Sequence, residues 1–193
     1  MQAGMGFFAN WGVVRQILGM MPIVIGLICL PVLATEADGS HYDISANSIR
    51  DGCNLNFSKE LHPLPNDPLS MPQFDILAKW ICRDGEVSDF DKYAINGSNP
   101  SVVDVLFWRG NYIIVIVKWV INSSASDYAG DFYRVFSYRR QQLGGRAAIV
   151  RDSAIEGFFP SGWDGYDRNG SKVKYPFKDA RSIKMVLRKN NVR

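Results

Sequence analysis

The chain has 193 residues, of which 47% are hydrophobic and 21% charged, and its formal net charge is +3. This composition is that of an ordinary globular protein, and it excludes a disordered chain. The charge is unevenly spread, because residues 35–131 hold 14 acidic and 7 basic side chains whereas residues 132–193 hold 5 acidic and 14 basic ones. Such polarity marks either a basic surface for an acidic partner or two halves that fold together and cancel.

Residues 1–34 have the features of a secretory signal peptide. They hold no acidic residue and a single Arg15, which is followed by an apolar run up to Ala34. Val32 and Ala34 stand at the positions that signal peptidase recognises, and polar residues follow at once. We expect cleavage after Ala34 and a periplasmic or secreted location, with no stable membrane insertion of the mature chain. An uncleaved membrane anchor is the alternative, which two prolines in the apolar run disfavour.

After cleavage, we expect residues 35–51 to form a flexible leader and residues 52–193 to form a single domain. Removal of the signal would also remove Cys29, which leaves Cys53 and Cys82 as a pair in an oxidising compartment. The sequence therefore predicts one disulfide between them. A metal site is the alternative, but two cysteines and the histidines His41 and His62 have unsuitable spacing, and we expect no metal.

The first regular element expected in the domain is a helix at PQFDILAKWICRDG, residues 72–85. Its apolar residues Phe74, Leu77, Ala78 and Ile81 recur at helical spacing. Pro72 suits a first helical turn, and Gly85 suits the end of a helix.

The run SVVDVLFWRGNYIIVIVKWVIN, residues 101–122, is the strongest strand signal, because β-branched and aromatic residues dominate it. Gly110-Asn111 divides the run and predicts a hairpin. The second arm, residues 112–121, is apolar on both faces apart from Lys118. This pattern predicts a central strand that is covered above and below.

A third strand is expected at residues 131–140, and Gly144-Gly145 is expected to turn the chain into residues 146–151. The stretch WDGYDRNGSKVKYP predicts another hairpin, with a type I′ turn at Asn169-Gly170. A closing helix follows at residues 178–190, with Asp179 as its cap, inward-facing Ile183, Val186 and Leu187, and basic residues at its end. The expected fold is α+β, with an antiparallel sheet of about five to six strands flanked by an N-terminal and a C-terminal helix.

The sequence contains no common catalytic, phosphate-binding or dinucleotide-binding motif, so we expect no cofactor and more readily a binding protein than an enzyme. The WDGYDRNG loop fails as a calcium loop, because a glycine and a proline stand where oxygen ligands are needed. Asp164 and Asp167 could serve as acid and base in a secreted hydrolase, which stays open as the catalytic alternative. Nucleic acid is not an expected partner, because the chain is predicted to be exported and has no readout motif.

The candidate partner-binding residues are aromatic and charged side chains of the types that dominate protein interfaces. They are Trp163, Asp164, Tyr166 and Arg168 in the predicted hairpin, together with Arg139 and Arg140. Four Asn-x-Ser sequons also occur, at Asn56, Asn96, Asn122 and Asn169, and these would carry glycans only in a eukaryotic secreted protein.

The C-terminal stretch GWDGYDRNGSKVKYPFKDARSIK resembles the end of some periplasmic immunity proteins of type VI secretion effectors. Those proteins share a signal peptide, one small α+β or β-rich domain and no catalytic motif. The resemblance implies a non-catalytic inhibitor that blocks a cell-wall-degrading effector by protein–protein contact. A secreted hydrolase or a structural envelope protein are the alternatives.

Overall fold

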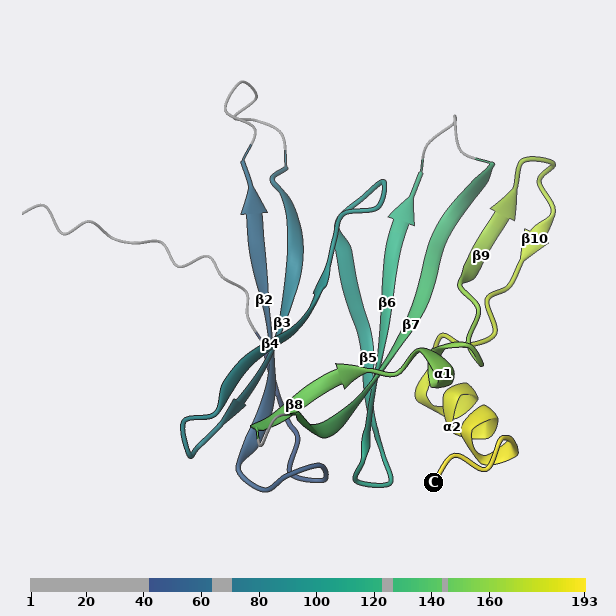
Figure 1. Cartoon of the computed structure of the whole chain (residues 1–193). Helices are drawn as coiled ribbons and strands as arrows, with labels where there is room; N and C mark the ends of the chain where they lie inside the picture. The colour runs from purple at the N-terminus through teal and green to yellow at the C-terminus, as the bar shows by residue number, and fades with distance from the viewer. Residues whose placement is uncertain (1–41, 64–70, 123–126, 144–145) are drawn as a thin grey trace, which may run out of the picture. The chain divides into compact units, whose positions relative to one another are not determined.

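The structure is a computed structural model that describes residues 42–63, 71–122, 127–143 and 146–193. The expected signal peptide at 1–34 and the expected turn at Gly144-Gly145 lie outside these residues. Over the described ranges, the chain forms ten β-strands and two helices (Figure 1). The strands make two antiparallel sheets, of four and six strands.

The four-stranded sheet has its strands in chain order, and each strand is antiparallel to its neighbours. Its strands are β1 (Tyr42–Ser45), β2 (Cys53–His62), β3 (Gln73–Cys82) and β4 (Val87–Tyr93).

The six-stranded sheet has the order β10-β9-β7-β6-β5, and β8 pairs with β7. Its strands are β5 (Pro100–Trp108), β6 (Tyr112–Ile121), β7 (Tyr128–Leu143), β8 (Arg146–Arg151), β9 (Gly162–Asp167) and β10 (Lys172–Val173). Helix α1 (Ser153–Glu156) follows β8, and helix α2 (Ala180–Lys189) follows β10.

Strand β6 is buried on both faces, as its sequence predicts. Ile113, Val115 and Val117 belong to a core that also contains Leu55, Phe57, Ala78 and Trp80 of the other sheet. Ile114 and Ile116 belong to a second core with Ile183 and Leu187 of α2. The four-stranded sheet therefore covers one face of the strand and α2 covers the other.

The helix expected at residues 72–85 is wrong, because this segment forms strand β3. Ile76, Ala78, Trp80 and Cys82 alternate along it and are buried. The opposite face also carries apolar side chains, such as Leu77 and Ile81, which creates helical spacing by coincidence. A short helix is marginal in isolation, whereas β3 pairs with β2 in register over all ten of its residues.

The overall layout is therefore sheet-rich, and the expectation of one sheet between an N-terminal and a C-terminal helix is corrected to two sheets with α2 on the six-stranded one. The expected leader also differs in its second half. Residues 42–45 form β1, paired with β2, and Ala46 after it is fully buried. Ile44 packs against the core between the sheets, which gives this segment a place in the sandwich.

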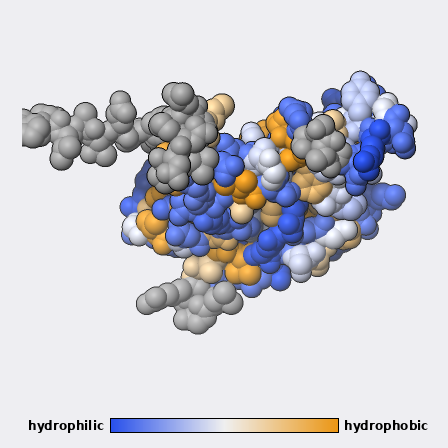
Figure 2. All heavy atoms as spheres, turned by 90° about the horizontal axis from the view of Figure 1, so that it is seen from above, coloured by the Kyte–Doolittle hydropathy of each residue, from blue (hydrophilic) through white to orange (hydrophobic). Residues whose placement is uncertain are grey.

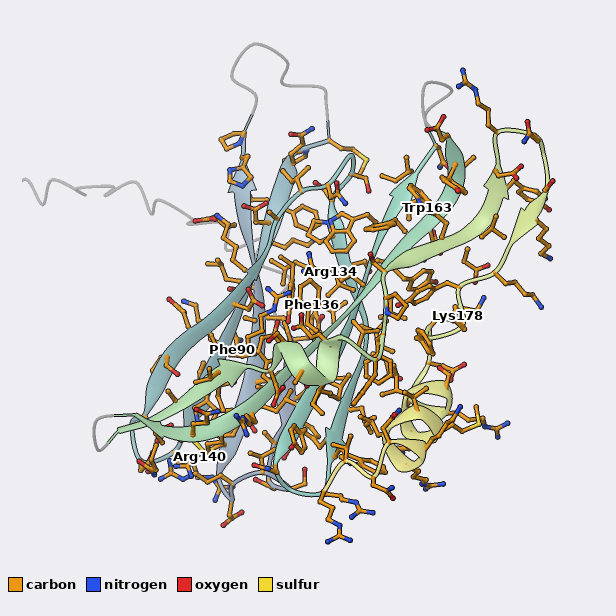
Figure 3. The ribbon with its side chains drawn as sticks, turned by 45° about the vertical axis from the view of Figure 1, so that its right-hand side comes forward. Phe90, Arg134, Phe136, Arg140, Trp163 and Lys178 are labelled. Atoms are coloured by element: carbon orange, nitrogen blue, oxygen red, sulfur yellow. A yellow bond between two sulfur atoms is a disulfide. The ribbon has the colours of Figure 1, made fainter. Side chains whose placement is uncertain are left out.

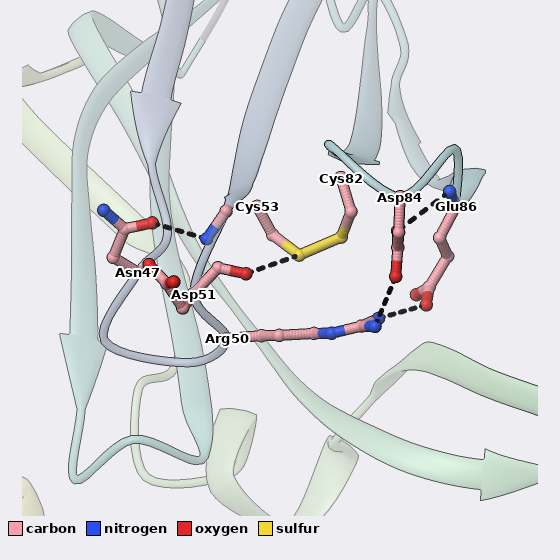
Figure 4. Close-up of a disulfide and its surroundings, with 8 residues drawn as sticks. Asn47, Arg50, Asp51, Cys53, Cys82, Asp84 and Glu86 are labelled. Atoms are coloured by element: carbon pink, nitrogen blue, oxygen red, sulfur yellow. Dashed lines mark hydrogen bonds and ion pairs between the residues drawn. A yellow bond between two sulfur atoms is a disulfide. The ribbon is translucent and has the colours of Figure 1, made fainter.

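The disulfide between Cys53 and Cys82 is confirmed (Figure 4). The two cysteines are direct partners in the β2–β3 register, and both are buried. Arg50 reinforces the same end of the sheet, because its guanidinium pairs with Glu86 and lies 2.6 Å from Asp84 in the β3–β4 turn. A covalent and an ionic link thus join the start of β2 to the end of β3.

The C-terminal helix is also confirmed. The carboxylate of Asp179 accepts a hydrogen bond from the backbone N–H of Ser182 at 2.8 Å, which caps the first turn. Ile183 and Leu187 are fully buried, and Arg188 and Lys189 occupy the last turn. Over the described part of the chain, no helix is both long and apolar enough to cross a membrane.

Candidate binding groove

Strand β7 changes its partner halfway along its length on one of its two edges. Residues Tyr128–Tyr133 pair with β9, and Tyr138–Leu143 pair with β8. Residues 134–137 between these two stretches pair with β6 on their other side. The backbone of residues 134–137 is therefore not paired with a strand on this edge, and within this stretch the side chain of Arg134 is exposed.

Two adjoining hollows of about 400 and 240 Å³ lie along β7 on the side that faces β4, and they share Asn96 and Phe132. We call them together the aromatic groove. Its walls come from the end of β4 and the chain after it and from β6, β7 and β9, with Arg151 of β8 at one end. The residues that the argument uses are Asn96, Trp119, Phe132, Arg134, Phe136, Arg151 and Trp163.

A row of aromatic rings forms the apolar part of the groove. Trp163 stacks on Tyr128 at 5.1 Å between ring centroids, and it contacts the ring of Phe132 at the same distance. The ring centroid of Phe132 in turn lies 6.1 Å from that of Trp119. Trp163 and Phe132 are half-buried, so their rings are held by neighbours but still reach solvent.

Two arginines flank Phe136 at the other end of the groove. The guanidinium carbons of Arg134 and Arg151 lie 4.9 and 4.8 Å from the centroid of its ring. Arg151 is paired with Glu156 through two contacts of 2.7 and 3.0 Å. Among the described residues Arg134 has no ion pair, and its side chain is exposed. Figure 3 shows Arg134 and Phe136 together on β7, with Trp163 farther along toward the β9–β10 hairpin.

Beneath Phe136, two tyrosines and a carboxylate make a buried network. The hydroxyls of Tyr93 and Tyr138 lie 3.1 Å apart, and the Tyr138 hydroxyl donates to Asp91. Burial raises the pKa of both tyrosines well above the ordinary value of 10. Both hydroxyls therefore stay protonated near neutral pH and act as structural donors.

The predicted hairpin residues are placed in different surroundings. Trp163 lines the groove, whereas Tyr166 is 54% exposed at the far end of β9. Asp164 is paired with Lys178. Arg168 lies at the hairpin tip, 3.4 Å from Asp127, and is strongly exposed. Of these four residues, the structure brings only Trp163 into the groove.

Arg139 and Arg140 lie farther along β7, where it pairs with β8, and they do not line the groove. Arg139 pairs with Asp152 at 3.3 Å. The Nε atom of Arg140 is buried, and it has no hydrogen-bond partner among the described residues. Arg134, which sequence reasoning missed, lines the groove together with Arg151 and Lys92, and it is the cation of these three that has no ion pair among the described residues. Its position in the RVFSYRR run resembles that of its neighbours, so no pattern in the sequence distinguishes it.

The WDGYDRNG hairpin is confirmed, but its turn is not the expected type I′ turn at Asn169-Gly170. The backbone N–H of Gly170 donates to Asp167, so Arg168 and Asn169 are the central turn residues, and Gly170 follows at a φ of 76°. The Asp167 carboxylate selects this turn, because it accepts the N–H groups of Asn169 and Ser171 at 2.9 and 2.8 Å. The third residue of the loop, Gly170, has a positive φ, which only glycine adopts without strain.

This turn also bears on the hydrolase alternative. Asp167 is engaged by two backbone amides, and Asp164 is engaged by Lys178. Both carboxylates thus have structural partners that hold the hairpin together.

A second group of charged side chains gathers on the four-stranded sheet, and sequence reasoning missed it as well. Glu60, His62 and Asp75 each place one potential ligand atom within 4.8 Å of the others. Lys92 of β4 contacts both carboxylates, at 2.9 Å for Asp75. The ammonium thus offsets part of the negative charge of the two carboxylates. The pairing of β2 with β3 brings this cluster together, because Glu60 and His62 share one face of β2 and Glu60 lies opposite Asp75 on β3.

Asp75 should make the stability of the fold depend on pH in the acid range. Burial alone would raise its pKa, but hydrogen bonds from Lys92, the Ile95 backbone and His62 outweigh burial and lower the pKa from 3.8 to about 2. A carboxyl whose pKa is lower in the folded than in the unfolded chain stabilises the fold at every pH above its unfolded pKa. This stability is lost as the pH falls through the folded pKa. Chemical denaturation should therefore show that the free energy of unfolding of the native protein falls between pH 5 and pH 2. The Asp75→Asn variant should lack this fall. The control Asp89→Asn, which removes an exposed carboxylate, should show the same fall in stability as the native protein. If the dependence of stability on pH were the same in Asp75→Asn as in the native protein, Asp75 would not be its source.

Comparisons with protein families, with curated proteins and with solved structures found no match to this chain.

Proposed function

We propose that the chain is a non-catalytic binding protein that takes an exposed segment of another protein into the aromatic groove. The observation that carries the proposal is Arg134, an exposed cation without an ion pair among the described residues, at the end of a row of rings that includes the half-buried Phe132 and Trp163. Aromatic and arginine side chains dominate the energetics of protein interfaces, and a rigid ring loses little entropy when it is covered. The groove offers both types, already held in position by their neighbours.

The resemblance of the C-terminal stretch to periplasmic immunity proteins gives this proposal its specific form. In that form, the partner is a cell-wall-degrading effector, and binding blocks the effector's activity. The excess of basic residues in 132–193 supports an acidic partner surface, because this half supplies Arg134 and Arg151.

Charge reversal at Arg134 tests the groove directly. Arg134→Glu should fold normally, because the side chain is exposed, and it should weaken partner binding about 30-fold, the loss expected at an interface hot spot. The matched control is Arg181→Glu, which makes the same charge change on an exposed residue of α2. The partners to be measured are the purified products of the adjacent genes, by calorimetry and by inhibition of their wall-degrading activity.

Two results would count against the proposal. If the chain bound neither adjacent product and left their activities unchanged, the immunity function would be wrong. If it bound one of them and Arg134→Glu lost no more affinity than Arg181→Glu, the groove would not be the binding surface.

A further inference from the structure

A second groove, of about 570 Å³, lies where the first three strands of the four-stranded sheet meet the start of β5. We call it the β5 groove. Most of its surface is apolar, and its principal side chains are Tyr42, Phe57, Phe74, Ile76, Pro100 and Val102. The volume is within the range of small-molecule sites in proteins. Figure 2, which looks onto the molecule from above, shows apolar side chains reaching the surface in small patches among hydrophilic ones.

The apolar wall of the β5 groove is continuous with the protein core. Phe57 and Ile76 are buried members of the core between the sheets, and Phe74 and Val102 pack against it. Tyr42 stacks on Phe57 at 5.2 Å and remains 40% exposed. The wall is therefore rigid and already formed, so a ligand would not have to order it.

Among the described residues that line the groove, Lys59 is the one cation, and it stands at the edge of the apolar wall. The ammonium of Lys59 lies 4.6 Å from the centroid of the Phe74 ring, and its side chain is exposed. In the part of the chain that the structure describes, Lys59 has no ion pair, whereas Lys79 on β3 and Lys92 on β4 each contact a carboxylate. The hydroxyl-bearing residues Ser58 and Ser101 also line the groove.

We infer that the β5 groove binds an anionic amphiphile, whose single hydrocarbon chain lies against the apolar wall and whose carboxylate or phosphate pairs with Lys59. The apolar lining favours transfer of the hydrocarbon from water, by about fourfold in affinity for each methylene that becomes buried. The unpaired ammonium selects a negative head group over a neutral one. This inference does not depend on the proposed function, because Arg134 and Trp163 lie in the other groove.

The test uses calorimetry with three probes below their micelle concentrations: dodecanoate, dodecyl phosphate and dodecanol. We expect one dodecanoate or dodecyl phosphate per chain. Which of the two binds more tightly distinguishes a fatty acid from a phospholipid-type head group. Affinity should rise from octanoate to dodecanoate and then level off once the groove is full.

Two variants separate the head group from the hydrocarbon chain. Lys59→Gln should weaken binding of the anionic probes about tenfold and leave dodecanol unchanged. Ser101→Trp, at an exposed position that lines the groove, should fill it and prevent binding of all three probes. Lys79→Gln is the control for loss of a lysine on β3, and circular dichroism confirms that each variant is folded.

Several outcomes would overturn the inference. Absence of binding below the micelle concentration would do so, and so would binding that neither Lys59→Gln nor Ser101→Trp weakens. If Ser101→Trp disrupted binding of the protein partner while no amphiphile bound to the native chain, the β5 groove would belong to a protein interface instead. Arg134→Glu should leave dodecanoate binding unchanged, so failure of one proposal is distinguishable from failure of the other.

Discussion

Removal of the disulfide in a Cys53→Ala, Cys82→Ala double variant should lower the free energy of unfolding by about 3 kcal/mol. The two cysteines are 29 residues apart, and closure of a loop of this length restricts the unfolded chain by about that amount. The variant should still fold, because β2 and β3 pair along their whole length. Urea denaturation measures the change.

A reducing agent provides the matched control for this prediction. It should shift the midpoint of the native protein toward that of the double variant and leave the double variant itself unchanged. A difference in stability below about 1 kcal/mol would contradict the view that the covalent link at this end of the sheet stabilises the fold.

The second large effect is expected at Gly165 in β9, where there is no room for a side chain beside β7. Gly165 pairs with Gly130, and a Cβ atom on Gly165 would lie 2.1 Å from the carbonyl oxygen of Ala129. Because that obstacle is backbone, Gly165→Val should separate the two strands. The cost should be about 3 kcal/mol, at the upper end for overpacked sites. Trp163 would then leave the aromatic groove, and partner binding should be lost.

Hydrogen exchange locates this damage. Amides of residues 128–133 and 162–167 should lose protection, while those of β2, β3 and β6 keep it. Gly157→Ala is the control, because Gly157 has a φ of −58° and a Cβ there would meet its nearest neighbour at 3.4 Å. It should change stability by less than about 0.5 kcal/mol. Uniform loss of protection in Gly165→Val would show that the hairpin and the sandwich unfold together.

The elements that sequence patterns predict correctly are those in which one physical signal dominates. Ile113 to Val117 are apolar at every position, which only a strand covered on both faces tolerates. The closing helix combines a cap at Asp179 with apolar residues at helical spacing. The disulfide was predictable because the predicted loss of the signal peptide removes Cys29 and leaves two cysteines, which can pair with each other.

Sequence patterns fail where two periods coincide or where the site depends on register. Residues 73–82 fit both a helix and a strand, and pairing with β2 decides between them. The hairpin at 162–173 was predictable, but the Asp167 side chain set its turn type. The aromatic groove could not be predicted, because its walls come from segments far apart in the sequence that only the pairing and packing of the strands bring together.

The divided pairing of β7 also bears on how the surface can change in evolution. The β9–β10 hairpin is attached to the six-stranded sheet through residues 128–133 of β7. The buried cores are built largely on the rest of that strand and on β6. Within the hairpin, constraints fall on Gly165, which contacts Gly130, and on Trp163, whose ring packs against Tyr128 and Phe132, whereas the exposed Tyr166 and Arg168 meet few. The wall that carries Trp163 can be remodelled for a new partner while the disulfide-linked sheet beside it stays the same.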